Sequence, residues 1–204
     1  MIQTRFFFLL FFSFAFSIHS FSQKVMVNVF MENKKNLANS DIIYYDFNRR
    51  LTWKDFQGVP DVHHFGGAVT SSGFAFNSEM NFDGENMNLI IGVYSYFSKK
   101  KSWKKSSIHS DYHLLHEQHH FDITRLGAQR LIDEFQRAHF TKANYNSLMN
   151  AIFDKVYDEN RELQEQYDRE TKNSINVKKQ LEWNEKITAE LKKLEMNVAI
   201  QNGQ

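Results

Sequence analysis

Apolar and polar residues alternate along the first half of the chain, as they do in β-strands. A period of two residues places successive side chains on opposite faces of a strand. Strands are predicted over Lys24–Phe30, Asp41–Asp46, Ala68–Asn77 and Asn86–Phe97. The last segment is the most apolar and aromatic, and the turn signal Asp83-Gly84 comes just before it. The pattern therefore predicts a strand-rich region over residues 24–100.

From residue 107 to residue 197 the apolar residues recur at helical spacing. Helices are predicted over about Ser110–Arg137, Lys142–Thr171 and Val177–Met196. Ser107 or Ser110 is the expected N-cap of the first helix, and Thr141 that of the second. The third helix carries an apolar stripe made of Leu181, Ile187, Leu191 and Leu194. This stripe is too short for a coiled coil, so we expect it to pack on its own domain. Strands followed by helices indicate the α+β class, with a mixed or antiparallel sheet.

The first residues have the features of a secretory signal peptide. Arg5 precedes the short apolar run Phe6–Ile18, and the segment ends in the small-x-small pattern Ser20-Phe21-Ser22. The run is too short for a membrane-spanning helix, which needs roughly 20 residues. We expect residues 1–22 to be removed and residues 23–204 to form a single domain. The mature protein would be secreted or periplasmic, with no stable membrane insertion.

Composition narrows the classes of function. Lys and Arg total 25 and Asp and Glu total 24, so the net charge of +1 favours neither nucleic acid nor an anionic membrane surface as a partner. The absence of cysteine excludes disulfides, thiolate metal sites and a cysteine nucleophile. The nine histidines are the remaining distinctive feature, and their positions suggest metal chemistry.

His116, Glu117 and His120 form the motif H-E-x-x-H within the first predicted helix. Residues four apart lie about 40° from each other around a helix, so both imidazoles can bind one Zn²⁺. Glu117 lies about 100° round from His116, beside the open position of such a metal, where a general base acts on bound water. The alternative interpretation is a surface helix that is merely rich in histidine.

The other histidines carry weaker expectations. His109 and His113 fall on the same helix face as His116 and are candidates for pocket lining. His119 is displaced round the helix and has no expected role. His63 and His64 lie in a loop rich in Gly and Pro, and we expect them to be exposed; the alternative is a place in a substrate cleft.

A catalytic zinc needs a third protein ligand and an open fourth position. If the first two helices form an antiparallel hairpin, the two histidines face residues 161–166 of the second helix. The carboxylates near this level are Glu162, Glu165, Asp168 and Glu170. Asp168 lies beside the apolar face of that helix and is the first candidate. Glu170 is the runner-up, whereas Glu162 and Glu165 point toward solvent.

Four stretches of the chain resemble a known family. They are Tyr45–Pro60, Leu115–Ile123, Tyr167–Thr171 and Gln180–Trp183. In these stretches the chain resembles the bacterial secreted, zinc-protease-like family catalogued as domain of unknown function 922, which is grouped with the zincin-type metallopeptidases. The resemblance implies a zincin-like fold and hydrolysis of peptide bonds by a zinc-bound water, with Glu117 as the general base.

The resemblance also bears on the third ligand. In the family pattern a histidine follows the Tyr167–Thr171 segment, where this chain has Asn173. Asparagine is a poor zinc ligand, which leaves Asp168 as the expected third ligand. Tyr167 and His113 are candidates to stabilise an oxyanion.

The expected protein is thus a secreted metallopeptidase that binds one Zn²⁺ per chain through His116, His120 and Asp168. It would act on a peptide or protein substrate, and an edge of the strand-rich half would bind an extended peptide. The alternative, motivated by Asn173, is a catalytically inactive zincin-fold binding protein of the envelope.

Overall fold

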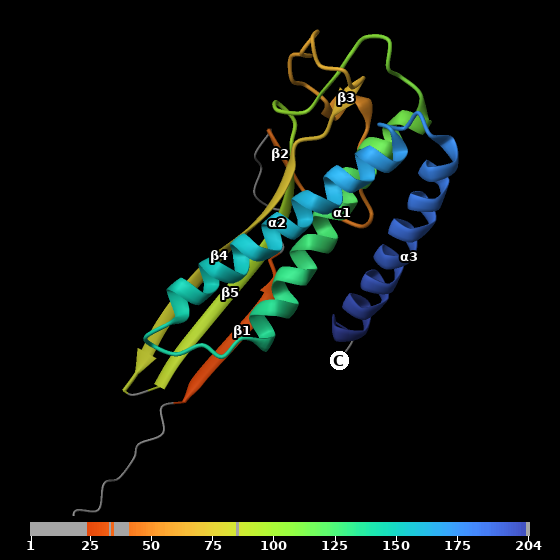
Figure 1. Ribbon diagram of the computed structural model, residues 1–204. Helices are drawn as coiled ribbons and strands as arrows, with labels where there is room; N and C mark the ends of the chain where they lie inside the picture. Colours follow the sequence, from red (N-terminus) through yellow and green to blue (C-terminus); the bar gives the residue numbers. More distant parts are fainter. Residues whose placement is uncertain (1–23, 33, 35–40, 85, 203–204) are drawn as a thin grey trace, which may run out of the picture.

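The computed structural model describes residues 24–32, 34, 41–84 and 86–202 (Figure 1). Residues 1–22, the predicted signal peptide, lie outside the described residues. Within the described ranges no helix is both long enough and apolar enough to span a membrane. The fold is α+β, as the sequence predicts: a mixed sheet comes first and a helical half follows.

The main sheet is built on the long strand β5 (Asn86–Ser98). It pairs antiparallel with β4 (Ser72–Asp83), to which it is joined by a turn at Gly84. Gly84 has a φ of +58°, in the left-handed region that glycine adopts readily. Along its other edge β5 pairs in parallel with β1 (Val25–Met31) and then antiparallel with β2 (Ile42–Tyr44). The short strands β3 (Ala68–Val69) and β6 (Trp103–Lys104) form a second, two-stranded sheet.

Three long helices follow the strands. α1 (Asp111–Arg137) and α2 (Tyr145–Thr171) lie against the main sheet, and α3 (Val177–Asn202) lies beside them (Figure 1). α1 begins as expected, because Ser110 Oγ caps it by accepting from the backbone N–H of His113 at 3.3 Å. A single turn of 3₁₀ helix, Trp53–Asp55, lies in the long connection between β2 and β3.

The predicted N-cap of the second helix is wrong. α2 begins at Tyr145, and Asn144 is the N-cap residue. Thr141 lies in the preceding turn, where its hydroxyl accepts from the N–H of Asn144 at 3.2 Å and its own N–H donates to the side chain of Asn144 at 2.7 Å. The two residues satisfy each other's polar groups before the helix starts, so the helix is three residues shorter than its apolar spacing suggested.

The main core lies between the sheet and the first two helices. Alternate side chains of β5 are buried, among them Met87, Leu89, Ile91 and Val93. They pack against buried residues of α1 and α2, such as Leu131, Phe135 and Val156. This core fixes the positions of α1 and α2, which carry the candidate site.

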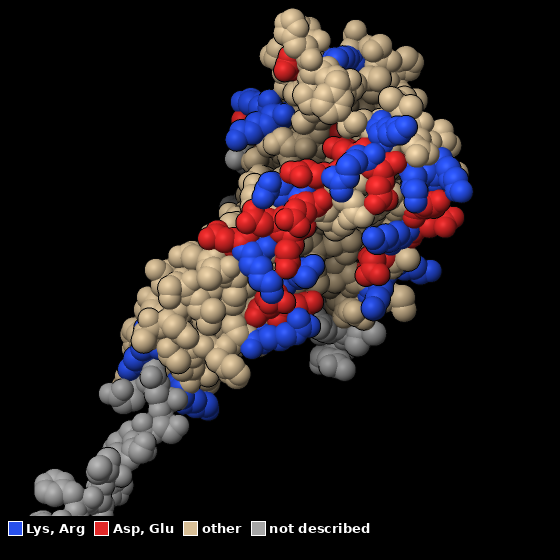
Figure 2. Space-filling model, in the orientation of Figure 1, with Lys and Arg blue, Asp and Glu red and all other residues tan. Residues whose placement is uncertain are grey.

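The helix α3 packs on α1 and α2 through a smaller core. Trp183 and Ile187 of α3 are buried against Ile123 and Tyr167. The predicted stripe is wrong at Leu181, which is 55 % exposed, because the buried position is taken by Gln180, which is 1 % exposed. The outer surface of α3 and of α2 from residue 154 onward is charged, with both signs interspersed (Figure 2). A polar side chain in the buried face of α3 needs a partner, and it finds one in the candidate site.

Candidate metal centre

The structure brings together the three side chains that the sequence singled out as ligands. His116 and His120 lie one turn apart on α1, and Asp168 reaches them from α2. Oδ1 of Asp168 lies 3.2 Å from Nε2 of His116 and 3.0 Å from Nε2 of His120. One ligand atom of each residue lies within 4.8 Å of the others, so the three form a cluster able to hold a metal ion.

Each histidine of the cluster is oriented by a glutamine. Nδ1 of His116 lies 2.8 Å from Oε1 of Gln180, and Nδ1 of His120 lies 2.6 Å from Oε1 of Gln164. An amide oxygen only accepts hydrogen bonds, so each Nδ1 is the donor. In its neutral form, the form that binds a metal, each ring therefore carries its single N–H at Nδ1 and directs its Nε2 lone pair into the cluster. Metal-binding histidines are held by hydrogen bonds of this kind.

The electrostatics of the cluster favour a bound cation. Oδ1 of Asp168 is buried, and with both rings neutral no donor among the described residues satisfies it. Burial opposes the charged form of His120, but Asp168, by hydrogen bonding and by charge, outweighs this and raises the pKa of His120 to about 9. Burial likewise disfavours ionised Asp168, yet the two histidines hold the pKa of its carboxyl well below its usual range. Two imidazole nitrogens and one carboxylate oxygen are a donor set that suits Zn²⁺.

Glu117 lies next to the cluster and is 5 % exposed. Its Oε2 accepts a hydrogen bond of 2.7 Å from the hydroxyl of Thr70, which lies between β3 and β4. Glu117 and the three clustered residues line one pocket of about 660 Å³. Facing α1 across this pocket are residues 64–70 and the start of β4. The carboxylate of Glu117 is therefore fixed beside the cluster and open to the same cavity.

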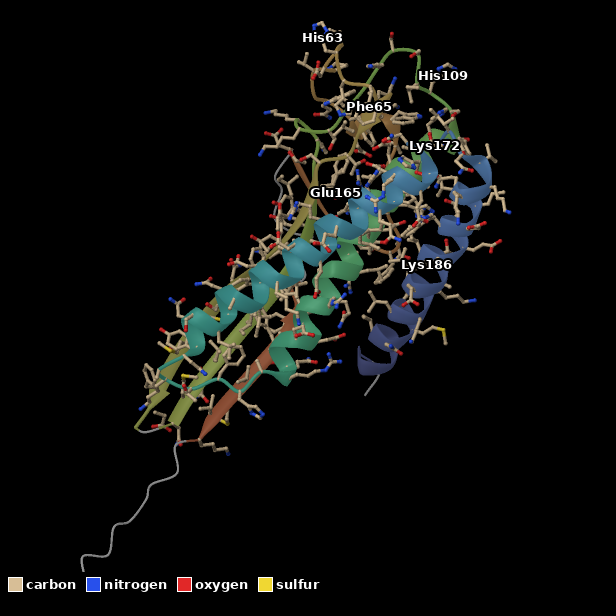
Figure 3. All side chains as sticks on the ribbon, viewed as in Figure 1. His63, Phe65, His109, Glu165, Lys172 and Lys186 are labelled. Atoms are coloured by element: carbon tan, nitrogen blue, oxygen red, sulfur yellow. The ribbon has the colours of Figure 1, made fainter. Side chains whose placement is uncertain are left out.

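The other carboxylates considered as ligands lie elsewhere. Glu170, the runner-up, accepts from Nε1 of Trp183 at 2.9 Å and from Nε2 of Gln166 at 2.7 Å. It links α2 to α3 and does not belong to the group of His116, His120 and Asp168, which is the candidate metal-binding group among the described residues. Glu162 is exposed, and Glu165 lies at the pocket rim, 3.5 Å from Arg161 (Figure 3). Of the four candidates, Asp168 is the one whose carboxylate meets both histidines.

Tyr167 does not take the place expected of an oxyanion-binding group. Its ring is fully buried and stacks on the ring of His116 at a centroid distance of 4.6 Å, and it is not among the residues that line the pocket. Tyr167 therefore packs against His116 on the side away from the pocket. His113 does line the pocket, and its Nδ1 lies 2.6 Å from the hydroxyl of Ser110.

The solvent exposure of the remaining histidines differs in part from the expectation. His63 and His109 are exposed at the end of the molecule beyond β3 (Figure 3). The expectation that His64 is exposed is wrong. It is half-buried in the pocket wall, where its ring stacks on Phe65 and meets Trp103 edge-on.

Sequence reasoning missed a buried polar network behind the metal cluster. Asp122 is fully buried and accepts hydrogen bonds from Tyr45 (2.9 Å), Gln118 (2.8 Å) and His119 (2.9 Å). Gln118 in turn accepts from the backbone N–H of Leu51 at 2.7 Å. The network fastens the connection after β2 to α1, so His119 has a structural role. Asp122 and Tyr45 both lie in the stretches on which the family resemblance rests. Their place in those stretches was the sequence signal that could have pointed to the network.

A family model matches the chain over residues 97–174, from the end of β5 to the turn after α2. That family is DUF922, described as a bacterial protein of unknown function. The predicted resemblance to this family is confirmed over this range, which includes Leu115–Ile123 and Tyr167–Thr171 but not the other two stretches. The matched segment contains His116, His120 and Asp168 as well as Glu117. Comparisons with curated proteins and with solved structures found no match. α3 lies outside the matched segment.

Proposed function

We propose that this protein is a secreted zinc metallopeptidase with a zincin-like fold. The observation that carries the proposal is the cluster of His116, His120 and Asp168, in which the two Nε2 lone pairs and Oδ1 converge within 4.8 Å. Glu117 stands beside this cluster in the same pocket. Two histidines and an intervening glutamate on one helix are the arrangement used by zinc-dependent peptidases.

His116, His120 and Asp168 would hold the zinc ion, leaving one coordination position open to the pocket. When bound, zinc would polarise the scissile carbonyl and make a water molecule acidic enough to attack it. Glu117 would accept the proton from that water at its carboxylate and pass it to the leaving amine. Thr70 would keep the carboxylate in place through its 2.7 Å hydrogen bond. His113, which faces the pocket, would be the group available to bind the substrate carbonyl.

The substrate would be a peptide or protein. The pocket wall opposite α1 includes β3, Thr70 and the start of β4, an edge strand of the main sheet. Free N–H and C=O groups of an edge strand pair with an extended peptide, which would then lie across the metal centre. Residues 1–22 would direct the protein to the periplasm or the exterior, and the N-terminus of the exported protein would begin at Gln23.

The experiment compares the purified protein with Glu117→Gln, using zinc analysis and a mixed peptide library. We expect one zinc per chain in both proteins, peptide cleavage by the wild type, and a loss of about 10²–10⁴-fold in kcat/KM in the variant, the range for removal of a general base. Glu165→Gln is the matched control, because Glu165 is an exposed glutamate of the same pocket.

Two outcomes would contradict the proposal. A protein without zinc after reconstitution would exclude a metallopeptidase. A protein that binds zinc but cleaves no peptide would favour the inactive binding protein, the alternative suggested by Asn173, which lines the pocket.

A further inference from the structure

Gln180 is a buried polar residue at the contact between α3 and the candidate metal centre. Its side chain is 1 % exposed, although its neighbours on the buried face of α3 are apolar. Burying an amide without hydrogen bonds costs roughly 1–3 kcal/mol, so a buried glutamine is stable only where its polar atoms find partners. The partners here belong to α1, α2 and α3.

Three polar contacts of Gln180 fix the orientation of its amide. Oε1 accepts from Nδ1 of His116 at 2.8 Å. Nε2 donates to the hydroxyl of Tyr167 at 2.6 Å and to Oδ1 of Asn184 at 2.7 Å. Both N–H hydrogens of the amide are thus used, and rotating the amide by 180° would place Oε1 against Oδ1 of Asn184, two acceptors with no hydrogen between them. Oε1 therefore remains directed at His116.

The orientation of Gln180 decides which nitrogen of His116 carries the hydrogen. Because Nδ1 must donate to Oε1, the lone pair of the neutral ring is on Nε2, the atom 3.2 Å from Asp168. Turning the ring over by 180° would put Cδ2 where Nδ1 lies and break this bond, whereas stacking on Tyr167 holds the plane of the ring. Gln180 thus holds His116 in the one tautomer and the one orientation in which it can bind the metal.

His120 is held in the same way, but from another element. Gln164 of α2 accepts from Nδ1 of His120 at 2.6 Å, and its Nε2 donates to the backbone carbonyl of His120 at 2.9 Å. Gln164 lies inside the segment that matches the family model, whereas Gln180 lies beyond it. The matched segment alone therefore lacks the group that orients one of its two histidine ligands.

We infer that Gln180 is a positioning residue for the metal ligand His116, and that α3 is for this reason an integral part of the metal centre. The inference rests on the metal-binding part of the proposed function and does not depend on the reaction. Loss of a hydrogen bond to a metal-binding histidine typically weakens metal binding about 10–100-fold. Displacing α3 would have at least the same effect, because it removes Gln180.

The test measures the zinc dissociation constant by competition with a chromophoric chelator. Gln180→Met keeps the volume of the side chain but cannot accept from Nδ1, and we expect zinc binding to weaken about 10–100-fold. Gln180→Glu restores the acceptor, and we expect it to recover most of the affinity. Gln166→Met is the matched control, because Gln166 is a half-buried glutamine that contacts Glu170 instead of a ligand.

A second readout separates positioning from general destabilisation. The visible spectrum of the Co²⁺-substituted protein reports ligand geometry, and we expect it to change in Gln180→Met but not in Gln166→Met. Urea unfolding of the metal-free proteins shows whether each variant is folded at the start of the titration. If Gln180→Met does not fold, Gln180→Glu is compared with the wild type. A zinc affinity of Gln180→Glu that is about 10–100-fold below that of the wild type would refute the role of the acceptor, because this variant keeps the acceptor.

The two proposals fail in different ways. No zinc binding by the wild type would refute the proposed function. Zinc binding by the wild type with an unchanged dissociation constant and Co²⁺ spectrum in folded Gln180→Met would overturn the inference and leave the proposed function intact.

Discussion

The pairing of Asp168 with His120 makes a specific prediction about the metal-free protein. Replacing Asp168 with Asn keeps the size of the side chain and removes its charge. In the chelator-treated wild type, the carboxylate attracts a proton to His120 and raises its pKa from 6.5 to about 9. We expect Asp168→Asn to abolish this shift, because an amide cannot stabilise the imidazolium by charge.

The expected size of the effect follows from the pKa shift. A shift from 6.5 to about 9 corresponds to roughly 3 kcal/mol, at about 1.4 kcal/mol per pKa unit. The side chain of Asp168 is 39 % exposed, so solvent screens part of the interaction and about 2 kcal/mol is a realistic value. Because the folded-state pKa is the higher one, this stabilisation is fully present below pH 6.5 and is lost as the pH rises through about 9.

The assay is urea unfolding of both proteins in the presence of a metal chelator, at about pH 6 and about pH 10, on either side of the two pKa values. The free energy of unfolding of Asp168→Asn should be lower by about 2 kcal/mol at the acidic pH and close to that of the wild type at the alkaline pH. An equal difference at both pH values would refute the reasoning, since a loss of packing or of uncharged hydrogen bonds does not depend on the protonation of His120.

Two further predictions test the metal centre and the network behind it. Zinc must displace the proton held by His120, so zinc binding at pH 7.5 should release close to one proton per ion. Calorimetry in buffers of different ionisation enthalpy measures this release, and no release would contradict the raised pKa of His120. Asp122→Ala leaves two buried donors and the half-buried Tyr45 hydroxyl unpaired, and should lower the free energy of unfolding by about 3 kcal/mol. The exposed Asp154→Ala is the control and should change it little; similar values for both variants in urea unfolding would contradict a structural role for the network.

Local patterns in the sequence were sufficient for the elements and for part of the site. The spacing of apolar residues predicted the three helices, and the β-rich segments predicted β1, β2 and β5, because both patterns depend only on near neighbours in the chain. The single strand predicted over Ala68–Asn77 is wrong, because it is divided into β3 and β4, which belong to different sheets. The pairing of His116 with His120 is equally local. Residues four apart on a helix face the same direction whatever the helix packs against. An assumed antiparallel hairpin of the first two helices narrowed the third ligand to a few carboxylates of the second helix, with Asp168 as the first candidate.

Contacts between distant segments could not be predicted from these local patterns. Nothing in the alternation of β1 shows that it pairs in parallel with β5, since this depends on where the connection between them runs. Helix periodicity places both Asp168 and Glu170 near the level of the histidines and does not distinguish them. The packing of α3 explains why Glu170 does not join the histidines, because its carboxylate accepts a hydrogen bond from Nε1 of Trp183 instead.

The sequence by itself therefore determined the α+β class, from the order of its strand and helix patterns, and the three helices, from periodicity within each. It also determined that His116 and His120 share one helix face with Glu117 nearby. Tertiary structure alone decided which carboxylate joins the histidines, that His64 borders the pocket, and that Gln164 and Gln180 orient the two rings. The physical reason is that a side-chain hydrogen bond extends only about 3 Å. Whether two residues 64 positions apart come within that distance depends on how whole helices pack, and no local pattern encodes it.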